Sequence, residues 1–292
     1  MFGRILRALA LLALGGCIQI PVYVPLDPTT RASLKEIRVV SAIPQDEIYL
    51  SAASPGVAAA MGGGLLAAVI ESQIAKGRQD AIQATIGPFY AAIDDIDFRK
   101  DYWQAVMPEL GKLFPGAALD VKTTAAQMLL AERNKLVAAL PVGKGLVYLT
   151  TRYSFTPDFS RLDMVTSIDA WRGGRQASAD RPEPAYSNVL FYQSAQVAAS
   201  GNDAIALWGR DNAKLYRAAL AEGIAETTRM MRLDAEHARI KGVDQRPQGS
   251  TRTVEARKAA PGMVAVTGPV LEESPARWVI RNNDGRLHSL AR

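Results

Sequence analysis

The stretch LVYLTTRYSF at residues 146–155, followed by LDMVTSIDAW at residues 162–171, decides the fold class of this chain. Both runs are rich in β-branched and aromatic residues, which is typical of β-strands. The short connection between them contains Pro157 and Asp158, and this arrangement predicts an antiparallel hairpin. The run YSNVLFYQSAQV at residues 186–197 predicts a third strand in the same sheet.

Helical patterns flank these strands on both sides. Downstream, residues 211–237 place apolar side chains at helical spacing on one face, which predicts a long helix. Upstream, Asp97 is a typical N-cap for a helix that begins at Phe98 and stops before Pro115-Gly116. We also expect strands at residues 37–43, 47–51 and 119–122, and helices from residue 70 to near residue 87 and over residues 125–140.

The C-terminal part of the sequence predicts a separate small β-unit. Residues 241–261 contain almost no large apolar side chains and carry a net positive charge, which is the composition of a linker. Residues 278–281 and 286–290 then flank Asp284-Gly285, a strong signal for a β-hairpin. We expect this unit, residues 262–292, to be either docked on the main domain or held loosely.

Together these patterns predict an α+β fold: a mostly antiparallel sheet with helices packed on one face, plus a small C-terminal β-hairpin unit. The strand–helix–strand–helix order of the first half is also compatible with a small α/β unit.

The first sixteen residues have the three parts of a cleaved secretory signal. Arg4 and Arg7 supply positive charge, an apolar run surrounds and follows them, and small residues end the segment. The apolar run is far shorter than the ~20 residues that a transmembrane helix needs. Removing residues 1–16 takes away both arginines and no acid, so the formal net charge falls from +5 to +3.

The end of this segment, Leu14-Gly15-Gly16-Cys17, resembles the lipobox of bacterial lipoproteins. The resemblance covers only these first residues. It implies cleavage before Cys17, a thioether between the Cys17 sulfur and diacylglycerol, and acylation of the new amino terminus, which together would attach the protein permanently to a membrane. Ile18 stands where an aspartate would retain a Gram-negative lipoprotein at the inner membrane, so the resemblance implies the outer membrane. The alternative is that Cys17 is an ordinary buried thiol behind a conventional signal.

Two further segments bear on how the chain meets the membrane. Residues 17–33 contain three prolines and no helical period, which favours an extended tether, with a leading edge strand as the alternative. The uncharged run Ile48–Ile70 is long enough for a second membrane segment, but Pro55 and a composition of Ala, Gly and Ser favour a turn and a buried helix. The predicted layout is a signal peptide at residues 1–16, a lipidated tether at 17–33, a main domain at 34–240, a linker at 241–261 and the C-terminal unit at 262–292.

No group of catalytic or metal-binding residues stands out. His237 and His288 are the only histidines, neither has a second histidine or a cysteine at metal-ligand spacing, and there is no G-x-S-x-G motif. The acidic run at residues 94–97 is best explained as a polar turn and helix cap, Glu272-Glu273 as a solvated turn, and Gly143-Lys144-Gly145 as a turn rather than a phosphate loop. We therefore predict no catalytic, cofactor-binding or metal residue, and one modification site, the lipidation of Cys17.

These observations favour a lipid-anchored envelope protein that faces the periplasm from the outer membrane and acts as a non-enzymatic binding or assembly factor. We expect it to meet the membrane through its lipid and an envelope protein through the exposed edge of the C-terminal hairpin. The small net charge and the compartment argue against nucleic acid. One alternative is a membrane-anchored hydrolase acting on cell-wall or envelope material; a weaker one is that residues 48–70 insert into the membrane as part of a pore.

Overall fold

The computed structural model describes residues 23–45, 47, 48, 50, 86–174, 182–237, 251–257 and 263–292. Its strands are β1 (Glu36–Ala42), β2 (Ala118–Thr124), β3 (Lys144–Phe155), β4 (Leu162–Arg172), β5 (Tyr186–Gln193), β6 (Thr251–Arg257), β7 (Met263–Glu273), β8 (Arg277–Arg281) and β9 (Leu287–Ala291). Its helices are α2 (Pro28–Ser33), α5 (Phe98–Leu113), α6 (Leu130–Ala138) and α7 (Gly201–His237). None of these helices is long and apolar enough to span a membrane.

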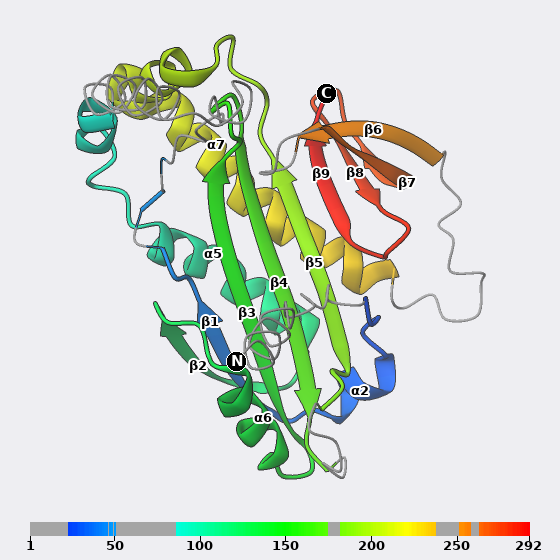
Figure 1. The fold of residues 1–292 in the computed structure, drawn as a ribbon. Helices are drawn as coiled ribbons and strands as arrows, with labels where there is room; N and C mark the ends of the chain where they lie inside the picture. Colours follow the sequence, from blue (N-terminus) through cyan, green and yellow to red (C-terminus); the bar gives the residue numbers. More distant parts are fainter. Residues whose placement is uncertain are drawn as a thin grey trace, which may run out of the picture.

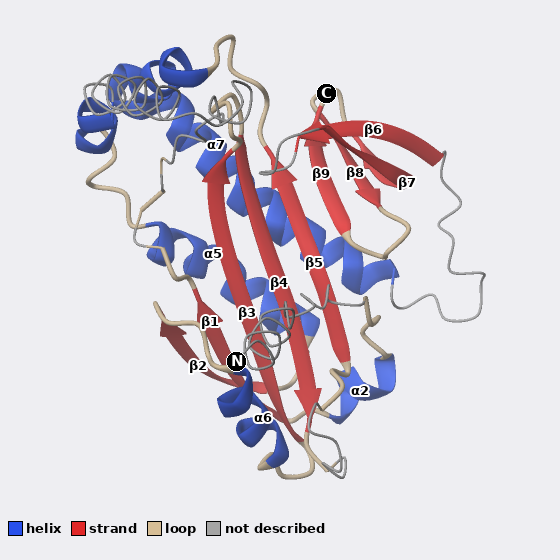
Figure 2. Cartoon of the chain, viewed as in Figure 1, coloured by secondary structure: helices blue, strands red, loops and turns tan. Residues whose placement is uncertain are grey.

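The fold is α+β, as the sequence predicts, with one nine-stranded, mostly antiparallel sheet (Figures 1 and 2). The strand order is β2-β1-β3-β4-β5-β9-β8-β7-β6. Strand β1 pairs in parallel with both β2 and β3, β5 pairs in parallel with β9, and the other pairs are antiparallel. The predicted hairpin and third strand form β3, β4 and β5 at the centre of this sheet.

The main core lies between the sheet and helices α5 and α7, which run across one face of it (Figure 1). Asp97 caps α5 as predicted, because its carboxylate accepts a hydrogen bond from the Lys100 N–H at 3.0 Å. The helix buries the apolar side chains Phe98, Tyr102, Val106, Leu110 and Leu113 against the sheet. Each fully buried side chain of this size contributes about 1.5–3 kcal/mol, so this stripe fixes α5 on the sheet.

Helix α6 packs on the opposite face. Because side chains alternate along a strand, Val40 and Leu146 point away from the main core and meet Val137 of α6 in a second cluster. We predict a helix over residues 125–140 from sequence, but it begins only at Leu130. The Met128 N–H donates instead to the Tyr148 hydroxyl at 2.9 Å, which holds the preceding residues outside the helix.

Two other upstream predictions meet the structure only in part. Glu47, Ile48 and Leu50, the described residues of a predicted strand at 47–51, belong to no strand. Ile48 is buried there, and its carbonyl accepts a hydrogen bond from the Tyr90 hydroxyl at 2.6 Å. Residues 51–70 of the uncharged run, and residues 70–85 of the predicted helix, lie outside the described residues. Residues 86–91 are helical, so this helix does not end near residue 87 as predicted.

Helix α7 begins ten residues before the predicted start and contains a break. Arg210 is extended, and Asp211, Asn212 and Ala213 adopt left-handed φ angles of 52°, 56° and 54°. A left-handed conformation costs a residue with a side chain roughly 1–2 kcal/mol. The segment is held by Arg217, whose Nε donates to the Asn212 carbonyl at 2.8 Å and whose guanidinium pairs with Asp95.

The C-terminal strands are part of the main sheet rather than a detached unit. Strand β9 pairs with β5 through Leu190 and Leu287, and Leu287 and Val279 are buried in the main core. Residues 251–257, inside the predicted linker, form strand β6 on the outside of β7. Pairing with β7 supplies the backbone hydrogen bonds that make a strand of this polar segment, although its composition is that of a linker.

A buried polar network joins this C-terminal part to α7. The Arg277 side chain, 4 % exposed, donates to the Ser289 hydroxyl at 2.9 Å, the Gln193 carbonyl at 2.6 Å and Glu222 at 3.1 Å. Arg281 likewise pairs with buried Asp234 at 2.8 Å. Both arginines come from β8, so these bonds fix the C-terminal strands on the helix.

The described end of the predicted tether is also docked. Val24 forms an antiparallel bridge with Ser187, and Leu26 and Leu34 are buried. Asp27 caps helix α2 by accepting from the Thr29 and Thr30 N–H groups. Residues 23–33 therefore form part of the domain rather than an extended spacer. Asp27-Pro28, an N-cap followed by proline at the first helical position, is the sequence signal for this helix.

Candidate functional site

His288, the one histidine whose side chain the structure describes, does not lie on the same face of the sheet as its neighbour Ser289. His288 is buried in β9 with its ring 5.4 Å from that of Phe191. The adjacent Ser289 faces the other side of the sheet, where its hydroxyl donates to Glu226 at 2.6 Å. His237 is the last residue of α7, and its side chain lies outside the described part. Cys17, the predicted lipidation site, also lies outside the described residues.

The acidic groups take structural partners. Asp95 pairs with Arg217, and this hydrogen bond lowers the pKa of the Asp95 carboxyl. Glu272 pairs with Arg229 at 2.6 Å, and Glu273 lies 3.4 Å from Arg292. Within the part of the chain that the structure describes, no three or more His, Cys, Asp or Glu side chains gather as a metal site would require.

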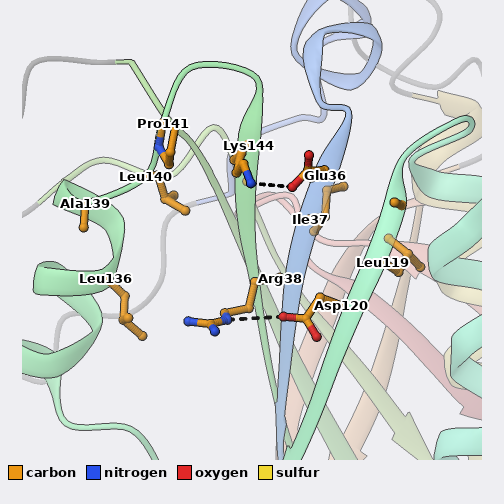
Figure 3. Close-up of a pocket in the computed structure, with 12 residues that line it drawn as sticks. Glu36, Ile37, Arg38, Leu119, Asp120, Leu136, Ala139, Leu140, Pro141 and Lys144 are labelled. Atoms are coloured by element: carbon orange, nitrogen blue, oxygen red, sulfur yellow. Dashed lines mark ion pairs between the residues drawn. The ribbon is translucent and has the colours of Figure 1, made fainter.

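The described surface is hollowed at one edge of the sheet, between α6 and strands β1 and β2 (Figure 3). This edge groove has a volume of about 470 Å³. Its α6 side is apolar, and its strand side carries the charged side chains. The lining residues are Glu36, Ile37, Arg38, Ala118, Leu119, Asp120, Leu136, Ala139, Leu140, Pro141, Lys144 and Gly145.

The charges on the strand side of the edge groove neutralise one another. Lys144 Nζ lies 2.5 Å from a Glu36 carboxylate oxygen, and Arg38 Nε lies 3.6 Å from Asp120, as Figure 3 shows. These side chains are between 47 % and 78 % exposed, so each pair adds little stability, about 0–1 kcal/mol. The strand side of the groove therefore carries two ion pairs and no net charge, which favours neither an acidic nor a basic ligand.

Exposed apolar side chains lie at the two ends of α6. Four large apolar side chains of the described residues are exposed, and Leu129, Leu130 and Val142 among them flank α6. Val142 is 84 % exposed and directly follows Pro141 of the groove, while Leu129 is 73 % exposed at the start of α6. Single exposed apolar residues are ordinary on a protein surface, so these side chains alone do not mark an interaction surface.

Strand β2 gives the edge groove an open backbone edge. Among the described elements β2 pairs with β1 alone, and it stands at the end of the strand order. None of its residues is buried. The outer N–H and C=O groups of an edge strand are available for pairing with another chain.

The sequence alone does not indicate this groove. The predicted strand at residues 119–122 lies within β2, whereas Lys144 and Gly145 of the predicted turn are the first residues of β3. Nothing in the sequence places β2 and α6 around one groove. Only the parallel pairing of β1 with both β2 and β3 brings Asp120, Arg38 and Leu136 together. Comparison with protein-family models, with curated proteins and with solved structures finds no match to this chain.

Proposed function

We propose that this chain is a lipid-anchored envelope protein, attached through Cys17 to the outer membrane, that faces the periplasm and binds another envelope protein without catalysing a reaction. The observation that carries the binding part is the open edge of β2 beside an apolar groove wall. The lipid attachment rests on the resemblance of Leu14-Gly15-Gly16-Cys17 to a lipobox.

The binding edge differs from the one that the sequence suggests. We expect from sequence that a partner meets the C-terminal hairpin, but β8 is paired on both sides, with β7 and β9, and β9 is also paired with β5. Removing residues 241–292 would expose Leu190 and Tyr192 of the main core. That deletion therefore tests folding rather than partner binding.

The occupant that the edge groove fits is an extended segment of a partner protein, added as a further strand beside β2. Such a segment would pair its backbone with the outer edge of β2, on the side away from α6, and would present alternate side chains to the two faces of the sheet. Because the ion pairs of Glu36 and Arg38 are already formed, such a segment would carry no net charge.

In-cell photocrosslinking tests this function. A photoreactive amino acid at Thr123, exposed on β2, should capture a recurrent envelope protein, and the same group at exposed Ala198 should not. Leu129→Glu combined with Val142→Glu should abolish the product, because both positions are exposed and place a charge at each end of α6, the apolar wall of the groove. Leu215→Glu is the matched control, since Leu215 is 48 % exposed on α7, away from the groove, and should leave the product intact.

The opposite pattern would contradict the binding proposal: no product at Thr123, or a product that survives the double variant. The lipid part is tested separately by the mass of the N-terminal peptide. That peptide should begin at Cys17 and carry diacylglycerol, and a Cys17→Ala variant should leave the membrane fraction.

A further inference from the structure

The outer edge of β2 offers the backbone groups of every second residue. Ala118 N donates to the Lys35 carbonyl at 2.8 Å, so the backbone groups of Ala118 point toward β1. At the other end of the strand, the Thr124 carbonyl accepts from Ile43 N at 3.0 Å and points the same way. Successive residues of a strand turn their N–H and C=O groups to opposite edges. The groups that point away from β1, where the strand order ends (Figure 1), are therefore those of Leu119, Val121 and Thr123.

These outward groups restrict how a second β2 strand can pair with the first. In an antiparallel pair, the residues that exchange both backbone hydrogen bonds lie directly opposite each other. A twofold axis through Val121, the middle residue of β2, would place Val121 opposite its own copy and Leu119 opposite Thr123 of the second strand. Every outward group of both strands would then have a partner, over the full seven residues of β2.

The same register places opposite charges against each other. Asp120 and Lys122 flank the axis, so Asp120 of each copy would lie opposite Lys122 of the other. Both side chains are exposed, Asp120 at 78 %, and Lys122 has no ion pair among the described residues. Residues at such non-hydrogen-bonded positions come closest, with Cα atoms about 4.5 Å apart. Each Lys122 would therefore gain a carboxylate partner that its own chain does not supply.

The neighbouring symmetric registers lack this complementarity. An axis through Asp120, or one through Lys122, would set that charge against its own copy, and like charges directly opposite each other destabilise a strand pair. An axis through Leu119 or Thr123 would shift Asp120 away from Lys122 and leave one end of β2 unpaired. The charges of this edge therefore select the register centred on Val121.

The other side-chain face of β2 brings apolar groups to the same axis. Leu119 and Val121 are half-buried and pack against the main core. In the register centred on Val121, the two Val121 side chains would meet across the axis, and each Leu119 would meet Thr123 of the other copy. The pairing would therefore bury further apolar surface next to the core of each molecule.

We infer that β2 pairs in antiparallel fashion with β2 of a second copy of this chain, about a twofold axis through Val121, so that the sheets of two molecules become one. The inference rests on the proposed binding function, whose site is the β2 edge, and it names the occupant of that edge. Residues opposite each other in an antiparallel pair point to the same face. The α6 helices of both molecules therefore lie on one face of the joined sheet, and both main cores lie on the other.

Charge reversal of one residue at a time tests this register. Lys122→Asp sets Asp120 against an aspartate, and Asp120→Lys sets Lys122 against a lysine, so each variant alone should weaken the dimer by about tenfold or more. An equal mixture of the two variants should recover the dimer, because every acid then faces a base, and this recovery also shows that both variants are folded. Lys214→Asp makes the same charge change at an exposed position on α7 and should leave the dimer intact. Light scattering of the full lipidated chain in detergent micelles gives its mass.

A disulfide locates the axis. Val121→Cys would lie opposite its own copy with Cα atoms about 5.5 Å apart, which is within the range that a disulfide spans. It should crosslink two chains on mild oxidation, whereas Thr123→Cys, which lies opposite Leu119, should not. Wild type, whose Cys17 sulfur carries the lipid under the proposed function, is the control and should give no crosslinked dimer.

A monomeric wild type, a dimer that both single variants leave intact, or a mixture of them that stays monomeric would each overturn the inferred pairing. Photocrosslinking at Thr123 separates this failure from that of the proposed function. A product of twice the mass of the chain supports the second copy. A product with a different envelope protein overturns the second copy but leaves binding at the β2 edge in place, and the absence of any product contradicts both.

Discussion

Asp163 makes the stability of this protein depend on pH in a direction that can be predicted. Its carboxyl lies at the start of β4, is 3 % exposed, and accepts a hydrogen bond from the Gln193 side-chain amide at 2.9 Å. Its second oxygen, Oδ2, has no hydrogen-bond partner among the described residues. Burial raises the pKa of Asp163 from 3.8 to about 7, and the Gln193 hydrogen bond and the Arg161 charge oppose this only in part.

The sign follows from proton binding. Between pH 4 and 7 the folded protein holds a proton on Asp163 that the unfolded chain has released, so the free energy of unfolding falls as pH rises through this window. A pKa change from 3.8 to about 7 corresponds to about 4 kcal/mol, at about 1.4 kcal/mol per pKa unit. Above pH 7 the Asp163 carboxylate is charged in both the folded protein and the unfolded chain. The full cost of burying this charge then lowers the free energy of unfolding.

Urea unfolding of wild type and Asp163→Asn between pH 4 and 8.5 measures this effect. Asparagine cannot ionise, so the variant should gain up to about 4 kcal/mol relative to wild type on going from pH 4 to pH 8.5. Asp203→Asn, at an exposed position on α7, is the control and should follow the wild-type profile. If Asp163→Asn and wild type lose stability with pH in parallel, Asp163 is ionised in the folded protein and the reasoning is wrong.

Two other features give predictions for stability. Arg277→Ala should lower the free energy of unfolding by about 1–3 kcal/mol, because it leaves the buried Gln193 and Ser289 carbonyls without their donor. Arg292→Ala, on a 37 % exposed arginine, should cost less than about 1 kcal/mol in the same urea titration. Asp211→Gly should raise the free energy of unfolding by about 0.5–1 kcal/mol, and the thermal midpoint with it, since glycine adopts a φ of 52° without strain. Lys214→Gly, next to the break, should instead destabilise by about 1 kcal/mol, and an equal response of the two variants would show that the left-handed backbone stores no strain.

The central strands and α5 could be predicted from sequence because their signals are local. The runs that form β3, β4 and β5 show β-branched and aromatic composition, and Asp97 before Phe98 is an N-cap before an apolar stripe. These features depend on residues close together in the chain. The predicted ends of these strands and of α5 therefore lie within a few residues of the ends in the structure.

The rest depends on contacts that a sequence does not display. Residues 251–257 have linker composition and become β6 only because β7 lies beside them. The break at residues 210–213 coincides with the predicted helix start at residue 211, but the turns of α7 before the break, from Gly201, are not predicted from sequence. The edge groove is likewise formed by the pairing of β1 with β2 and β3, and the single-site prediction at Cys17 gives no information about it.

The placement of β9 has a consequence for how the chain is made. Strand β9, which pairs with β5, is synthesised nearly a hundred residues after β5. The β5 edge therefore stays unpaired until the last residues have left the ribosome. Long-range pairings of this kind slow folding. Under the proposed export across a membrane, this delay would keep the chain open for longer, since the sheet cannot be completed before β9 is made. A chain that ends early, before Leu287, would keep the β5 edge exposed, become prone to aggregation and be degraded by proteases.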